Sequence, residues 1–198
     1  MNNDLREKLI SMMDAESKVR QQALVEERRY DGYPEALEAL HIRHAEELFR
    51  IINEYGWPGK SLVEKGGATA AFTLARNAIS KPGLQKQFFK HLQQAVTVGE
   101  ATSIQEACLQ DCILFYQGSP QRYGMFFDWE ESGELVVNVE NIAEANERRK
   151  RLGLKTLTED LLQHKNEIQQ ECGGPPQDIK EHKRQALAWA KRVGWRNA

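Results

Sequence analysis

The sequence has few cysteines, no long apolar run and no segment that could direct secretion, and each absence excludes a class of protein. Its three cysteines, Cys108, Cys112 and Cys172, lack the spacing of a disulfide or zinc-finger framework, so we expect three thiols. No stretch approaches the roughly 20 apolar residues that a membrane span needs. The N-terminal residues contain no uninterrupted apolar segment of the kind found in signal peptides. We therefore expect a cytoplasmic protein with no membrane partner.

The sequence also lacks a large excess of positive or negative charge. The chain has 27 Lys and Arg against 29 Asp and Glu, a formal net charge of -2. This balance provides no broad positive field of the kind that attracts nucleic acid, so a nucleic-acid partner is not expected. A phosphate-binding loop, a dinucleotide fingerprint and a nucleophile elbow are absent as well. The sequence thus gives no support for phosphoryl, acyl or nicotinamide chemistry, and we expect no cofactor.

What is present is helical periodicity. With 198 residues, of which 40% are hydrophobic, the chain can form one domain with a substantial core. Apolar residues recur at steps of three and four and predict successive helices over about 4–27, 37–56, 70–78, 82–96 and 104–115. The segment KSLVEKGG, residues 60–67, is predicted to be a loop because it has no such stripe and ends in two glycines.

The pattern changes at Tyr123. Two short aromatic or β-branched runs surround the sequence EESG, which predicts a β-hairpin within residues 123–139. Three further helical segments follow. The sequence therefore predicts a mainly α, single-domain helical bundle with one small β-hairpin packed on it. We expect this domain to occupy residues 1–157 and residues 158–198 to form a docked C-terminal helical extension.

Polar side chains interrupt the apolar stripes of four predicted helices. His41 and His44 lie in the series Leu37, His41, His44, Leu48, whose spacing places them on the buried face. Glu16, Asn77 and Asp111 occupy equivalent positions on the first, third and fifth helices. An unpaired buried carboxylate costs several kcal/mol, so such groups are expected to meet one another, water or a ligand. The alternative is that each lies at a helix end or is satisfied singly within the core.

The segment GSPQRYG can complete a polar pocket. Gln121 and Tyr123 alternate with Arg122 and therefore point to one side of an extended segment that follows the Asp111 helix. The opposite interpretation is that Gln121 binds backbone and Tyr123 only packs. The charged run NERRKR is predicted to be a solvated helix face. The candidate ligand-binding residues are Glu16, His41, His44, Asn77, Asp111, Gln121 and Tyr123.

Several motifs resemble an uncharacterised bacterial family, domain of unknown function 6624. The similarity runs through IINEYGWPGKSLV, LQDCILFYQGSPQRYGMFFDWEESGEL and RRKRLGL, over roughly residues 5–157. The positions that fit are Gly56, Trp57, Pro58, Asp111, Pro120, Gln121, Tyr123, Gly124, Arg148 and Arg149. The chain departs from the family pattern where Asn77 replaces a histidine, Cys112 an arginine and Met125 a threonine. The resemblance implies no known activity, and any chemistry of that histidine and arginine would be missing here.

Three functions remain open at this point. The first is a small-molecule-binding protein or enzyme, since histidines beside carboxylates suit acid and base work near neutral pH. The second is a metal site, for which His41 and His44 are weak candidates because their spacing alone is unspecific. The third is a non-enzymatic module, such as an immunity or adaptor protein, that binds a protein partner. Neither the reaction, the ligand nor the oligomeric state follows from the sequence.

Overall fold

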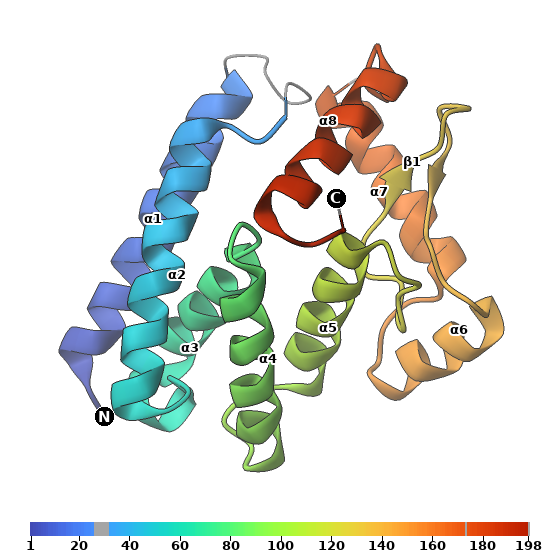
Figure 1. Ribbon diagram of the computed structural model, residues 1–198. Coiled ribbons are helices and arrows are strands. Elements are labelled where there is room, and N and C mark those ends of the chain that lie inside the picture. The colour runs from blue at the N-terminus through green and yellow to red at the C-terminus, as the bar shows by residue number, and fades with distance from the viewer. Residues whose placement is uncertain (26–31, 173, 198) are drawn as a thin grey trace. The chain divides into compact units, whose positions relative to one another are not determined.

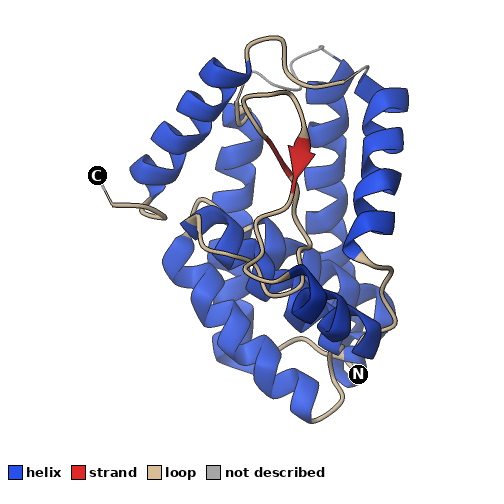
Figure 2. Ribbon diagram, turned by 90° about the vertical axis from the view of Figure 1, so that its right-hand side faces the viewer, coloured by secondary structure: helices blue, strands red, loops and turns tan. Residues whose placement is uncertain are grey.

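The structure is a computed structural model that describes residues 1–25, 32–172 and 174–197. These residues form eight helices and one two-stranded sheet, so the expected mainly α fold with a small hairpin is confirmed. Figure 2 shows how little of the chain is strand. The chain divides into two compact units, unit 1 (Met1–Leu109) and unit 2 (Gln110–Ala198). Whether residues 1–157 fold as a domain by themselves stays a prediction.

Unit 1 is a helical bundle. Its helices are α1 (Asn3–Val25), α2 (Glu35–Tyr55), α3 (Lys60–Asn77) and α4 (Pro82–Thr97). Helices α1 and α2 run side by side in opposite directions, and both pack on α3 (Figure 1). The predicted stripes form the core, in which Leu9, Leu48 and Phe88 are completely buried. Burial of each such side chain contributes roughly 1.5–3 kcal/mol, so the stripes determine how these helices pack.

The prediction of a loop over residues 60–67 was wrong, because α3 already begins at Lys60. A first turn ends in a kink at Val63 and Glu64, whose backbones are not helical, and the helix then continues through both glycines. Close packing explains the second glycine: a Cβ on Gly67 would lie 2.7 Å from Cβ of Val63. Val63 is fully buried. Glycine therefore serves here as a small residue inside a helix and not as a breaker.

Helix α5 (Ser103–Gln117) begins in unit 1 and ends in unit 2. The rest of unit 2 comprises β1 (Asp128–Trp129), β2 (Leu135–Val136), α6 (Ile142–Arg151), α7 (Leu157–Cys172) and α8 (Ile179–Val193). The strands pair antiparallel, with Trp129 opposite Leu135. After α8, the ring of Trp195 stacks on Tyr116 of α5 at 5.8 Å. The end of the chain thus packs back on α5 within unit 2.

The cysteines allow a direct test of the redox state. Cys108 and Cys112 are thiols, four residues apart on α5, and the side chain of Cys172 lies outside the described residues. Titration of the denatured, unreduced protein with a thiol reagent should find three thiols per chain, because the spacing indicates no disulfide framework. A value of one thiol per chain would show that a disulfide has formed.

Candidate functional site

The candidate site in unit 1 is built around Glu16. This residue continues the stripe of α1 one turn beyond Met12, and only 2% of its surface is exposed. A carboxylate at such a position must have hydrogen-bond donors, since its desolvation would otherwise cost several kcal/mol. His44 and Asn77, from two other helices, supply them, and His41 lies close to the carboxylate as well.

Helix α2 contributes both histidines. His44 Nδ1 lies 2.8 Å from Glu16 Oε1, and His41 Nε2 lies 3.3 Å from Glu16 Oε2. The two environments differ, because the side chain of His41 is 2% exposed whereas that of His44 is 14% exposed. The second ring nitrogen of His41, Nδ1, is hydrogen-bonded to the hydroxyl of Tyr33. His41 is therefore held between two polar groups inside the unit, whereas His44 reaches its surface.

Asn77, the last residue of α3, completes the cluster. Its Nδ2 donates to Glu16 Oε2 at 2.7 Å. Both oxygens of the carboxylate therefore have a hydrogen-bond donor, one from α2 and one from α3. The four residues Glu16, His41, His44 and Asn77 are hereafter called the Glu16 cluster.

The Glu16 cluster keeps its carboxylate ionised. Burial by itself raises the pKa of Glu16, but the contacts with His41 and His44 and the hydrogen bond from Asn77 outweigh it. The pKa of Glu16 consequently falls from 4.5 to about 2. At neutral pH the carboxylate of Glu16 is thus ionised and faces two imidazoles.

Asp111, the fifth polar residue predicted on a stripe, lies in unit 2 and binds backbone. It is fully buried on α5. Its Oδ1 accepts from the N–H of Arg122 at 2.8 Å, and its Oδ2 accepts from the N–H groups of Tyr123 and Met125 at 2.9 and 3.2 Å. Burial raises the pKa of Asp111, and the backbone donors offset part of that effect.

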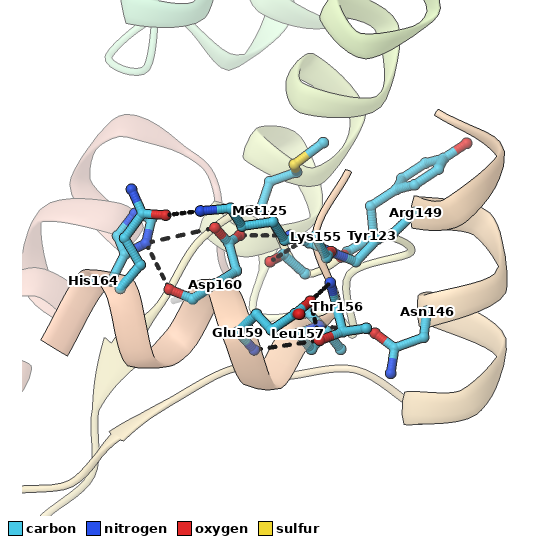
Figure 3. Close-up of polar contacts among 12 residues, drawn as sticks. Tyr123, Met125, Asn146, Arg149, Lys155, Thr156, Leu157, Glu159, Asp160 and His164 are labelled. Carbon is cyan, nitrogen blue, oxygen red and sulfur yellow. Dashed lines mark hydrogen bonds and ion pairs between the residues drawn. The ribbon is translucent and has the colours of Figure 1, made fainter. Parts of the chain in front are cut away.

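Gln121 also binds backbone. Its Nε2 donates to the carbonyl of Phe126 at 2.7 Å, and its Oε1 accepts from the N–H of the same residue at 2.9 Å. This paired contact closes a loop over residues 121–126. Tyr123 is half-buried within the loop, and its ring points away from Asp160 and His164 (Figure 3). The structure therefore brings together the four predicted site residues of unit 1, while Asp111 and Gln121 shape a loop in unit 2.

Arg149 was missed, because the run NERRKR was predicted to be solvated. That prediction was wrong at this position: Arg149 is 2% exposed and lies one helical turn after Ala145, which is also buried. Its guanidinium donates to the carbonyl oxygens of Lys155, Tyr123 and Gly124 at 2.6, 3.0 and 3.3 Å. It also forms an ion pair with Asp160 at 2.6 Å (Figure 3). The loop is consequently held by Asp111 through its N–H groups and by Arg149 through its carbonyl groups.

Two further polar contacts near the Glu16 cluster escaped prediction. Tyr33 comes from the turn before α2, where no periodic pattern indicates the direction of a side chain. Ser80, in the turn between α3 and α4, donates to Glu38 of α2 at 2.8 Å, and both residues are buried. The position of Glu38, three residues before His41, was a usable signal, because this spacing places both on the same side of α2.

Two other expectations concern metals and membranes. Over residues 1–25, 32–172 and 174–197, no group of three or more His, Cys, Asp or Glu side chains is arranged to hold a metal ion. In the same part of the chain, every helix falls short of the length and apolarity required to cross a membrane.

Comparison with known proteins gives one match. Residues 3–168 match the model of a family of unknown function (DUF6624), and the chain therefore belongs to this family. The match covers all four residues of the Glu16 cluster and the loop held by Asp111 and Arg149. No curated protein and no solved structure matches the chain.

Proposed function

We propose that unit 1 binds a small molecule at the Glu16 cluster and that His44 exchanges a proton with it. One observation carries this proposal: His44 Nδ1 lies 2.8 Å from a buried carboxylate while the same imidazole keeps 14% of its side chain exposed. A histidine oriented by a carboxylate and open on its other side is the usual arrangement of a general base.

The direction of the hydrogen bond determines which nitrogen acts. Because the Glu16 carboxylate can only accept, Nδ1 of His44 carries the proton that is shared with it. Nε2 of the neutral ring then has a lone pair for a proton of the ligand. When Nε2 takes that proton, the positive imidazolium faces the negative carboxylate, which stabilises the charge. Glu16 itself does not act as the base, since a pKa of about 2 makes it a weak proton acceptor.

His41 and Asn77 act on Glu16 as positioning residues. His41 is 2% exposed and lies between Glu16 and the Tyr33 hydroxyl, so it holds the carboxylate in place. Asn77 fixes the second oxygen. The family pattern described above has a histidine at this position. An amide retains the N–H donor but does not titrate, so the proposed proton exchange rests on His44 alone.

An activated ester tests whether His44 is an accessible base. Because an accessible imidazole oriented by a carboxylate accelerates the hydrolysis of p-nitrophenyl acetate, His44→Ala should remove most of the rate measured with the wild-type protein at neutral pH. The matched control is His91→Ala on α4, a half-buried histidine outside the Glu16 cluster, which should leave the rate unchanged. Equal rates for both variants and the wild type would contradict the proposal.

Stability measured on the same variant separates function from structure. His44→Ala should lower the free energy of unfolding by about 1–3 kcal/mol, because Glu16 Oε1 then loses its hydrogen-bond donor inside the unit. A loss of about 1–3 kcal/mol together with an unchanged rate is the signature of an orphaned structural partner and would refute a functional role. Urea unfolding gives the first quantity and the ester assay the second.

A further inference from the structure

Unit 2 contains an open cavity whose lining residues include none of the Glu16 cluster. Its volume is about 440 Å³, within the range of roughly 300–1,000 Å³ that small-molecule sites usually have. The wall is built from the end of α5, the loop 121–126, the hairpin and the region of α8, all within unit 2. Because Asp111, Gln121 and Arg149 fix the loop, this part of the wall is preformed.

Aromatic rings make up one component of the wall. Phe115 of α5 and Phe126 of the loop lie with their ring centroids 5.7 Å apart. Trp129 of β1 adds a third, half-buried ring. Aromatic faces of this kind favour a planar apolar group that can stack on them or meet their edges. The cavity therefore suits a ligand that contains an aromatic ring.

Two cationic side chains also line the cavity. Nε of Arg196 donates to the carbonyl of Tyr116 at 3.2 Å. Its guanidinium lies directly over Gly118, where a Cβ would be 2.9 Å from Cζ of Arg196. Gly118 therefore leaves the space in which the guanidinium is held. Neither Arg196 nor Lys183 forms an ion pair within the part of the chain that the structure describes, so both can receive a ligand carboxylate.

Carboxylates occupy the same wall. Among the residues that the structure describes, Asp128 of β1 accepts only from the adjacent N–H of Trp129, at 2.8 Å, and Glu130 accepts from Ser132 at 3.5 Å. A ligand with a single charge would meet groups of its own sign here. A ligand that carries both charges can pair with both kinds of group, and its ring can still reach the aromatic side chains.

We propose that this cavity is a binding site for a free aromatic α-amino acid. Its carboxylate pairs with Arg196 and Lys183, its ammonium group with Asp128 and Glu130, and its ring packs among Phe115, Phe126 and Trp129. A peptide lacks the combination of a free ammonium and a free carboxylate on one carbon, and it is therefore a poorer fit. The site is independent of the proposed proton exchange at His44, because it uses none of the Glu16 cluster.

Isothermal titration calorimetry of the full chain with three probes of one ring type tests the proposal. L-phenylalanine carries both charges, 3-phenylpropionate only the negative one and 2-phenylethylamine only the positive one. L-phenylalanine should bind at least about ten-fold more tightly than either, since each analogue leaves charged groups of the wall without a partner. Equal binding of the three probes, or no heat from L-phenylalanine at millimolar concentration, would overturn the assignment.

Two variants test which side chains of the cavity bind the carboxylate and the ammonium group of the ligand. Arg196→Gln should weaken L-phenylalanine about ten-fold or more and leave 2-phenylethylamine unchanged, whereas Asp128→Asn should weaken both amines and leave 3-phenylpropionate no weaker. Lys180→Gln is the matched control, because Lys180 is exposed on α8 and does not line the cavity. Binding of L-phenylalanine to Arg196→Gln with the affinity of Lys180→Gln would refute the proposal.

Discussion

Replacing Arg149 by alanine should lower the free energy of unfolding by about 3–5 kcal/mol, the usual cost of breaking a buried ion pair. The variant leaves Asp160 without its cation and removes the donor from the carbonyl groups of Tyr123 and Gly124. The loop should loosen as well. Urea unfolding measures the stability, and faster amide hydrogen exchange at Met125, whose N–H binds Asp111, reports the loosening.

The neighbouring arginine is the matched control. Arg148 also contacts the loop, through the carbonyl of Arg122 at 3.3 Å, but its side chain is 31% exposed and its ion pair with Glu144 lies at the surface. Arg148→Ala should therefore cost less than about 1 kcal/mol. Arg149→Lys should behave more like Arg149→Ala, since an ammonium group cannot reach all the acceptors that a guanidinium fork reaches. Equal losses for Arg148→Ala and Arg149→Ala would contradict this account.

Glu16→Gln should also be strongly destabilising, by about 3 kcal/mol at neutral pH. The size follows from the pKa of Glu16, which folding lowers from 4.5 to about 2, at about 1.4 kcal/mol for each pH unit. The amide that replaces one oxygen would also turn N–H groups toward the donors on His44 and Asn77. Glu7→Gln on the same helix is the control, because its side chain is 75% exposed, and it should change stability by less than about 0.5 kcal/mol.

The same pKa fixes how this loss depends on pH. Glu16 is more acidic in the folded chain, so its contribution to stability is complete above pH 4.5 and disappears as the pH falls toward about 2. The difference in stability between the wild type and Glu16→Gln should therefore shrink across that interval. A difference that stays constant from pH 6 to pH 2 would show that the charge of Glu16 is not its cause.

The parts of the molecule in which apolar residues recur at a regular spacing were predictable. Helical spacing fixes the direction of each side chain, which is why the sequence alone places Glu16 and His41 on buried faces. The hairpin was predictable because EESG separates two runs with strand propensity. The first turn of α3 was not predictable, since the two glycines after it are typical of a loop, and the packing of Gly67 against Val63 becomes evident only in the folded chain.

Contacts that reach backbone or come from loops left no comparable signal. Asp111 was correctly placed on a stripe, but its partners are N–H groups of a loop, which no pattern of side chains reveals. Arg149 was hidden because a run of charged residues usually faces solvent, and burial of one member depends on Asp160 lying eleven residues further along the chain. Tyr33 reaches His41 from a turn. In each case the prediction would have required the path of the backbone through segments that are neither helix nor strand.

The backbone path of the loop over residues 121–126 depends little on which side chains the loop carries. Asp111 and Arg149 hold positions 122–125 through main-chain atoms, which every residue at these positions except proline can provide. Met125 illustrates this freedom, since it binds Asp111 through its backbone N–H. Positions 122, 123 and 125 can therefore be diversified in a library while the backbone path is retained, which makes this segment a natural place to engineer or evolve new recognition.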